Sequence, residues 1–371
     1  MISRAGQRFA PEMRIIQPKR DIARWLFFLC GFIALIVIVG GTTRLTDSGL
    51  SITEWQPVTG IVPPLDQASW EAEFEKYRQI PEYQRINKGM SLAEFKRIYW
   101  WEWLHRLLGR MAGILFLVPF LYFLWLKRFS VRDMPHMLIM FVLGGAQGAL
   151  GWYMVKSGLV DRVDVSQYRL AAHLGMAFFL YGYIFWIAMG YLNGSKAGRT
   201  QLTVAGSTSL SRLSVLLCLL VFVQVLLGAL VAGLDAGLTY NSWPLMDGRW
   251  VPKGLWLETP AYLNLFENIT MVQFNHRMMA ILIAAIALVT LLSGCRSHVP
   301  GRVKAAVLLT VCVVAGQFAL GVWTLIAVVP IKLAILHQLG ALVLLSFTLI
   351  QLRAVRQWRN GRTLTAGMSP T

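Results

Sequence analysis

Four histidines stand in one recurring context, near the start of a long apolar run. The runs are WWEWLHRLLGRMAGILFLVPF, AAHLGMAFFLYG, FNHRMMAILIAAIALV and AILHQLGALVLLSF, and their histidines are His105, His173, His276 and His337. An ionisable side chain inside a membrane span is costly unless it binds a partner, so each of these residues is a candidate functional residue. The chain has six histidines, and the other two, His136 and His298, lie at the opposite ends of such runs without counterparts.

This pattern favours ligation of haem iron. A single intramembrane histidine is more often satisfied by a neighbouring carbonyl, but chance explains poorly four histidines at equivalent depth in alternate runs. Zinc in proteins usually takes four ligands, or three and a water, and no cysteine or carboxylate accompanies these histidines in a fixed pattern. Haem needs only one or two axial ligands, and the core of a helix bundle supplies apolar walls. We therefore predict that His105 pairs with His173, and His276 with His337, as axial ligands of two haems.

Charged residues next to the histidines are candidates for two further roles. Arg106 and Arg277 directly follow the first histidine of each pair, where a guanidinium can bind a haem propionate bidentately; snorkelling to the membrane interface explains them equally well. Glu54 is a candidate catalytic carboxylate, because Ser242 takes its place in the second half of the chain; a solvated loop acid is the alternative.

The elements that must position these residues are membrane-spanning helices. Of the 371 residues 56% are hydrophobic, and the mean hydropathy of +0.56 is typical of a polytopic membrane protein. A span needs about 20 mostly apolar residues. Eight runs qualify, so the fold class is all-α: 25–43, 107–126, 136–155, 170–191, 213–233, 276–293, 305–328 and 334–352.

Charge orients the spans. Lysine and arginine gather in the segments that have an even number of spans between them, whereas the opposite loops mix acidic and basic residues. We therefore expect a protein of the cell inner membrane, and the positive-inside rule places both of its termini in the cytoplasm. If the protein is mitochondrial, it lies in the inner membrane with both termini in the matrix. The net charge of +17 follows from this topology, and no nucleic-acid partner is expected.

The second half of the chain repeats the first. Five residues recur at one constant offset: Gly40, Asp47, Gly49, Leu50 and Trp55 return as Gly228, Asp235, Gly237, Leu238 and Trp243. Gln147 and Gly151 likewise return as Gln317 and Gly321. Each copy contains four spans, so the two copies are predicted to be parallel-repeat four-helix bundles rather than inverted repeats.

This repeat divides the chain into five parts. They are a cytoplasmic segment 1–24, an N-terminal bundle 25–192 with a long outer loop 45–101, a cytoplasmic linker 193–212, a C-terminal bundle 213–352 and a cytoplasmic tail 353–371. Within the outer loop, residues 66–98 are amphipathic and predicted helical, and we expect them to rest on the membrane interface.

Together these motifs resemble the haem A synthase family over residues 20–355. The resemblance rests on GGTTRLTDSGLSITEWQPVTGIVPP, EWLHRLLGR, the segment Asp235–Pro244, FNHR and the two later histidines. The long first outer loop is similar to the proteobacterial and mitochondrial branch. Some members carry a cysteine pair in an outer loop, and this chain has no cysteine in those loops.

The resemblance implies an oxidoreductase that converts a ring methyl of haem O to a formyl group by successive hydroxylations, giving haem A for terminal oxidase assembly. It implies that His105 and His173 frame the substrate haem, and that His276 and His337 hold a haem b that passes electrons. Glu54 matches the outer-loop glutamate of the family, which can accept a proton or stabilise positive charge. The implied partners are the lipid bilayer, haem O synthase, oxidase assembly factors, an electron acceptor and further copies of the chain.

Two other functions explain part of the pattern. A dihaem cytochrome b, quinol-linked or not, explains the four histidines equally well but gives Glu54 no task. A transporter or haem exporter would need a polar path across the membrane, whereas the polar groups gather on the outer side only.

Overall fold

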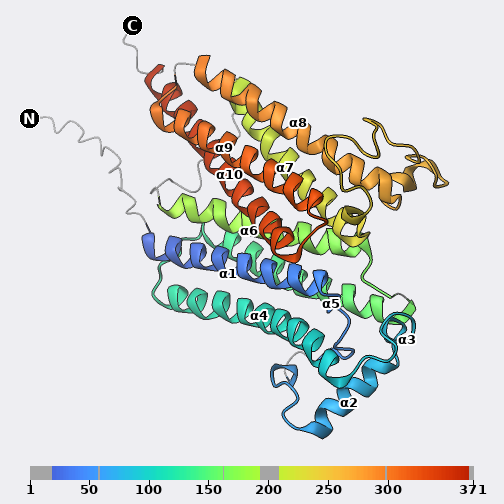
Figure 1. Ribbon diagram of the computed structural model, residues 1–371. Coiled ribbons are helices and arrows are strands. Elements are labelled where there is room, and N and C mark those ends of the chain that lie inside the picture. The colour runs from blue at the N-terminus through green and yellow to red at the C-terminus, as the bar shows by residue number, and fades with distance from the viewer. Residues whose placement is uncertain (1–18, 57–58, 162, 193–208, 297–298, 367–371) are drawn as a thin grey trace, which may run out of the picture.

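The computed structural model describes residues 19–56, 59–161, 163–192, 209–296 and 299–366, and helices dominate this part of the chain (Figure 1). The described residues contain eight helices that are long and apolar enough to cross a membrane, which confirms the predicted all-α class and number of spans. They are α1 (Arg20–Leu45), α4 (Leu92–Trp125), α5 (Met134–Asp161), α6 (Gln167–Leu192), α7 (Ser209–Gly233), α8 (Ile269–Arg296), α9 (Gly301–Ile326) and α10 (Ile331–Ala366). Of the predicted cytoplasmic segments, residues 1–18, 193–208 and 367–371 lie outside the described residues.

Helix α4 begins well before its apolar run. Ser91 caps it: the Ser91 hydroxyl accepts from the Glu94 amide at 3.3 Å, and the Glu94 carboxylate accepts from the Ser91 amide at 2.8 Å. This reciprocal pair satisfies two amide donors at the helix start and fixes its first turn. His105 therefore lies within a continuous helix rather than at its mouth, with its rotation set by several preceding turns.

The outer loop folds into a small body of its own. Its elements are a short turn η1 (Thr59–Ile61), then α2 (Gln67–Arg78) and α3 (Pro81–Arg85), followed by the first turns of α4. The predicted helical character of residues 66–98 is confirmed, but Pro81 and the left-handed Gly89 (φ 90°) divide the segment. Its apolar side chains, Trp70, Phe74, Tyr77 and Phe95, are buried against one another instead of facing outward.

Four helices form the middle of the molecule and four flank it. Helix α1 packs against α4, α6 and α10, whereas α7 packs against α8, α6 and α10; α5 lies on α6, and α9 lies on α8 and α10. The largest apolar core runs through the central helices and includes Leu26, Phe178, Leu217 and Leu342. A buried hydrogen bond of 2.7 Å between the hydroxyls of Tyr181 and Ser346 joins α6 to α10 inside this core.

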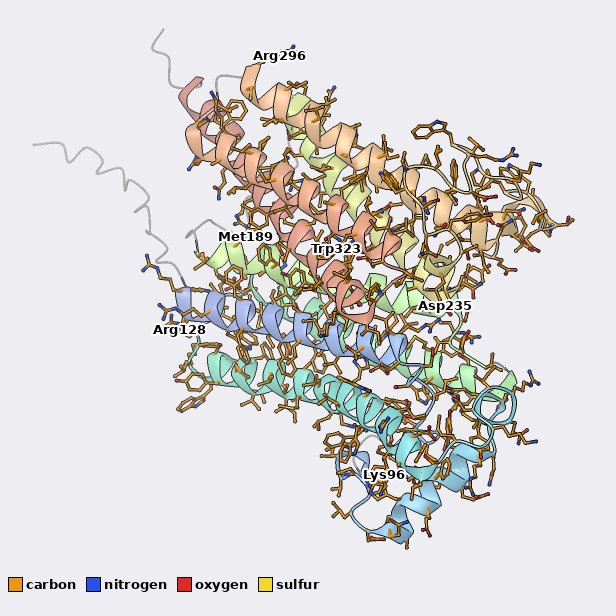
Figure 2. The ribbon with its side chains drawn as sticks, viewed as in Figure 1. Lys96, Arg128, Met189, Asp235, Arg296 and Trp323 are labelled. Atoms are coloured by element: carbon orange, nitrogen blue, oxygen red, sulfur yellow. The ribbon has the colours of Figure 1, made fainter. Side chains whose placement is uncertain are left out.

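The two ends of the helix bundle differ. The loop helices α2 and α3 and the long segment between α7 and α8 project at the same end (Figure 1). Figure 2 shows Arg128 and Arg296 near the other end, opposite Asp235 and Lys96. The loops that carry the candidate residues are thus gathered on one side.

Arg44 connects the first turns after α1 and α7. Its guanidinium binds Asp47 at 3.0 Å and Asp235 at 2.9 Å. Both aspartates have a left-handed backbone, with φ of 47° and 49°, a conformation that aspartate tolerates better than most residues. The equivalent residues of the repeat are therefore turn residues, and one arginine joins them at this end of the helix bundle.

Candidate functional site

Each of the four histidines packs against a glycine on the preceding membrane-spanning helix. A Cβ atom added to these glycines would lie 2.6, 2.8, 3.1 and 2.7 Å from the Cε1 atom of the imidazole, for the pairs Gly40–His105, Gly151–His173, Gly228–His276 and Gly321–His337. At Gly40, Gly151 and Gly321 a side chain would force the imidazole to shift, and at Gly228 the contact would be tight. The glycines let α1, α5, α7 and α9 approach the imidazoles closely, as small residues do between membrane helices.

Glutamines hold three of the four histidines. The amide of Gln147 donates to the His173 carbonyl at 3.1 Å and lies 3.2 Å from Nδ1 of its ring. Gln317 makes the same two contacts with His337, at 2.8 and 3.1 Å. In the same way, Gln224 donates to the His276 carbonyl at 3.0 Å and lies 3.3 Å from Nε2.

His105 lacks such a glutamine contact. At the constant offset of the repeat, Ile36 stands where Gln224 stands in the second half. The Nδ1 atoms of His105 and His276 are buried without a hydrogen-bond partner among the described residues. Gln147 and Gln317 were matched in the sequence repeat, but no role was predicted for them. Gln224 was not predicted as a functional residue. A polar side chain inside an apolar run was the signal that could have found it.

The spacing of the second histidine pair suits one metal ion. The ring centroids of His276 and His337 lie 6.5 Å apart, and the ring planes meet at 78°. Two imidazoles that each bind a metal through one nitrogen, at about 2 Å, place their centroids about 6 Å apart. Apolar helices surround the pair, so the residues present fit the axial ligation of a haem.

The first pair has the same support from its helices. His105 lies on α4 and His173 on α6, and α1 packs against both of these helices. In the second half α7 packs in the same way against α8 and α10, which carry His276 and His337. The two histidines of each predicted pair therefore lie on helices that share one neighbouring helix, and the pairing of His105 with His173 stays a prediction.

Arg106 and Arg277 hold the outer loops in matching ways. Arg106 donates to the carbonyls of Ile52 at 2.7 Å and Glu54 at 3.0 Å. Arg277 donates to the carbonyls of Tyr240 at 2.6 Å and Ser242 at 2.9 Å. These acceptors correspond to each other at the constant offset of the repeat, so both arginines fasten the same turn over their histidine. Their predicted contact with a propionate remains a prediction.

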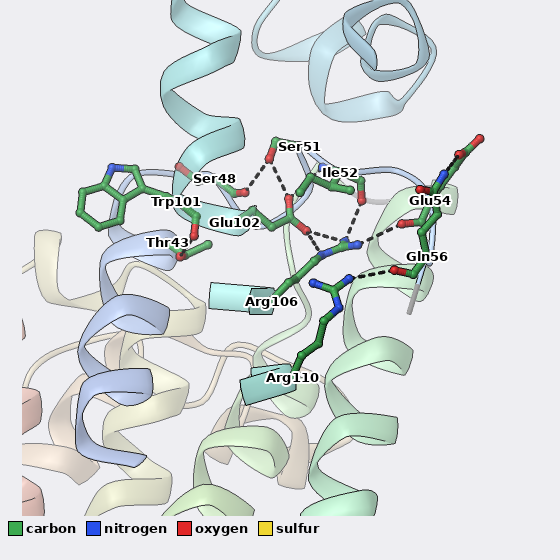
Figure 3. Close-up of polar contacts among 10 residues, drawn as sticks. All are labelled: Thr43, Ser48, Ser51, Ile52, Glu54, Gln56, Trp101, Glu102, Arg106 and Arg110. Atoms are coloured by element: carbon green, nitrogen blue, oxygen red, sulfur yellow. Dashed lines mark hydrogen bonds and ion pairs between the residues drawn. The ribbon is translucent and has the colours of Figure 1, made fainter. Parts of the chain in front are cut away.

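Glu102 is a buried carboxylate one turn before His105 and is 2% exposed. It accepts from the Ser51 hydroxyl at 2.7 Å, from the Ile52 amide at 2.8 Å and from the Arg106 guanidinium at 2.6 Å (Figure 3). Gln273 has the matching place in the second half and donates to the Tyr240 carbonyl at 3.1 Å. The unmatched charge at this position was visible in the sequence but was not selected as a site residue.

Glu54 lies farther out. Its side chain is 48% exposed and forms an ion pair of 3.1 Å with Lys76, and Gln56 donates to it at 2.8 Å. These two hydrogen bonds hold the pKa of the Glu54 carboxyl below its usual value. The side chain lines an outer cavity of about 410 Å³ that Arg106 and Arg110 also border. Arg106 of the histidine helix α4 therefore contacts the backbone carbonyl of Glu54, whereas the Glu54 carboxylate contacts Lys76 and Gln56.

Comparison with known proteins shows similarity over most of the chain. The family model COX15-CtaA, described as cytochrome oxidase assembly protein, matches residues 23–349. A protein of Nitrosospira multiformis named "Heme A synthase" is 49% identical over 93% of this chain and 94% of its own length. Proteins with the same name from Parvibaculum lavamentivorans and Paracoccus denitrificans are also 49% identical, over 87% and 89% of this chain and 90% and 86% of their own lengths.

Proposed function

Because the chain belongs to the COX15-CtaA family of cytochrome oxidase assembly proteins, we propose that it is a haem A synthase. In this reaction a ring methyl of haem O is hydroxylated twice, and the resulting geminal diol loses water to leave a formyl group. The net change from methyl plus water to formyl releases four electrons and four protons, and the electron acceptor proposed below takes up the electrons. The observation that carries the proposal is the set of four histidines, each seated on a glycine and arranged in two pairs. Oxidation of the methyl group makes the protein an oxidoreductase.

We assign the two haems to different halves. His276 and His337 hold a haem b, which supplies one-electron transfer when bound. His105 and His173 hold the substrate haem O. A substrate must enter and leave, which suits the half in which His105 lacks the glutamine contact that secures its counterpart His276.

The carboxylate that serves the chemistry must act near the substrate. Glu54 remains a candidate from its match to the family, and its carboxylate is exposed and paired with Lys76, which holds its pKa below the usual value. Burial and position favour Glu102 more strongly, because it lies on the helix of His105 and is one turn away. We propose that Glu102 holds the loop turn over the substrate and is the carboxylate that stabilises positive charge or takes a proton there.

The setting of the reaction follows from the helices. We infer that residues 25–192 and 213–352 form two parallel-repeat bundles, since the contacts of Arg106 and Arg277 and the four histidine–glycine contacts correspond between them. The protein would lie in the inner membrane with both termini in the cytoplasm, and the histidines toward the outer side. Haem O synthase, oxidase assembly factors and an electron acceptor are the proposed partners.

Haem composition tests this function. Purified protein is extracted, and its haems are separated by chromatography and identified by mass spectrometry. A haem A synthase contains haem O or haem A together with haem b, and cells that express it make haem A. Haem b alone, with no haem A in cells that also make haem O, would instead support the dihaem cytochrome. A protein without any haem would favour a transporter.

A further inference from the structure

Gln338 directly follows His337 on α10, and its side chain crosses to α1 in the other half of the chain. Its amide nitrogen donates to the Val37 carbonyl at 3.2 Å. The same amide group lies on Gly41, where an added Cβ would be 2.9 Å from Cδ and 3.2 Å from Nε2 and in still closer contact with Oε1. A side chain at position 41 would therefore displace the Gln338 amide group from this place.

The neighbouring glycine receives the histidine of the other pair. Gly40 packs against the His105 ring, with an added Cβ 2.6 Å from Cε1. Two consecutive glycines of α1 therefore contact one side chain from each half, His105 from α4 and Gln338 from α10. His337 is thus connected to His105 in three steps. Gln338 is its neighbour in the chain, the Gln338 side chain contacts α1 at Val37 and Gly41, and Gly40 of α1 packs against the His105 ring.

The repeat does not contain this connection twice. At the corresponding positions Leu174 follows His173, and Ala229 replaces Gly41. Both residues belong to apolar surroundings: Ala229 is 1% exposed, and Leu174 packs against the main core. At these corresponding positions the second interface has apolar residues, so the Gln338 contact with α1 has no counterpart there.

We propose that Gln338 is a positioning residue that couples the two histidine pairs, so that the state of the His276–His337 site changes the environment of the His105–His173 site. The proposal rests on haem binding at both pairs, as proposed above. A movement of His337 shifts Gln338 on Gly41, and α1 carries this shift to Gly40 under the His105 ring. Close packing transmits such movements because it leaves no empty space that could absorb them. Coupling between two binding sites is reciprocal, so a change at α1 must also affect the His337 site.

The forward test replaces Gln338 by Met, which keeps the length of the side chain and removes the amide donor. Gln351→Met is the matched control, since Gln351 lies on the same helix and donates to the Ser214 hydroxyl at 2.9 Å within the C-terminal half. Electron paramagnetic resonance and redox titration are recorded on the haem-loaded proteins, and His105→Ala and His276→Ala assign each signal to its pair.

We expect Gln338→Met to keep both haems but to shift the signal of the His105–His173 haem, changing its ratio of reduced to oxidised form at fixed potential by about two- to tenfold; tenfold is about 59 mV for one electron. Gln351→Met should leave that signal unchanged. If both haems are bound and the His105–His173 signal is the same in Gln338→Met as in the parent, the coupling is absent. A parent protein without haem at either pair would overturn the proposed function as well.

The reverse test starts on α1. Gly41→Ala should displace Gln338 and shift the signal of the His276–His337 haem, although α1 belongs to the other half. Gly31→Ala is its control, because no atom lies within 4 Å of the added Cβ. Shortening the opposing side chain in Gly41→Ala/Gln338→Ala should restore room for the methyl group and return that signal toward its value in Gln338→Ala alone. A Gly41→Ala protein with both parent signals would contradict the proposal.

Discussion

The imidazole rings of His276 and His337 lie 6.5 Å apart between centroids, and each ring packs against a glycine of the preceding spanning helix. Gln224 and Gln317 secure the two residues through their backbone carbonyls, at 3.0 and 2.8 Å. The helices therefore hold both residues of the pair in place through their backbones and through the glycines beneath their rings. A site prepared in this way loses little freedom when it binds its ligand.

Removing either member of this pair should remove one haem. His276→Ala and His337→Ala each delete an axial ligand, so we expect loss of the low-spin signal of haem b from the purified protein. His136→Ala is the control, since His136 binds the Tyr183 hydroxyl at 2.8 Å and belongs to neither pair. Optical spectra of the three variants give the answer; parent-like spectra for both ligand variants would exclude haem ligation in this half.

Enlarging the glycine beneath His105 should weaken the first site. Gly40→Ala would place a methyl group 2.6 Å from the ring, and overpacking of this kind costs about 1–3 kcal/mol. We expect the affinity of the His105–His173 pair for haem to fall roughly tenfold or more, measured by haem titration into the apoprotein. Gly31→Ala, on the same helix and in open space, should bind haem as the parent does. Equal affinity in the two variants would show that the ring does not need this contact.

Two glutamine substitutions separate the candidate carboxylates. Glu102→Gln should fold, because Gln273 occupies the matching place in the second half, but it cannot carry the charge or take a proton. We expect haem A formation to fall by about 10²–10⁴-fold, the range for a lost acid–base group, while both haems stay bound. Glu54→Gln should lower it less than about tenfold, since its exposed carboxylate pairs with Lys76.

The haem composition of cells and of each purified variant measures this difference. Accumulation of haem O or of a hydroxylated intermediate identifies the blocked step. A loss in Glu54→Gln as large as that in Glu102→Gln would support the catalytic role that the sequence predicted for Glu54. Loss of haem from Glu102→Gln would make Glu102 a residue of the binding site rather than of the reaction.

Glu82 should make the outer loop less stable as pH rises. It is 5% exposed, and burial together with the charge of Glu102 raises the pKa of its carboxyl to about 8. The unfolded chain loses this proton near the ordinary value of 4.5, so between these pH values the folded state binds more protons than the unfolded state, and stability falls as pH increases.

Thermal unfolding of the detergent-solubilised protein at pH 5, 6.5 and 8 measures this effect. The melting temperature of Glu82→Gln should depend less on pH than that of the parent, with its advantage largest at pH 8. Glu75→Gln is a suitable control, because Glu75 is exposed and pairs only with Arg78 in the described structure. Parallel pH profiles for the parent and Glu82→Gln would show that Glu82 is not a significant contributor.

The proposed orientation predicts the behaviour of reporter fusions. A reporter fused after Arg362 should be cytoplasmic, and one inserted near Gly248 should be external, because lysine and arginine gather on the side of the termini. Paired enzymatic reporters, one active only in the cytoplasm and the other only outside it, test both positions. The reverse result would place all four histidines toward the inner face.

The sequence by itself determined the number of spans, the pairing of the histidines in a repeat and the family resemblance. These follow from properties that are local in the chain: runs of about 20 apolar residues must cross the bilayer as helices. The histidines were also recognised locally, because each is an ionisable residue within an apolar run. Gly40 and Gly151 also recur in the repeat, but the sequence did not show that they contact the histidines.

Only the tertiary structure decided what those residues touch. Whether a glycine faces an imidazole depends on the rotation and approach of two helices, which hydropathy does not encode. The burial of Glu102 and the exposure of Glu54 depend on how the loop folds over α4, with Arg106 as the shared anchor. The contact of Gln338 with Val37 joins positions far apart in the chain, and it exists because the two halves pack with α1 against α10.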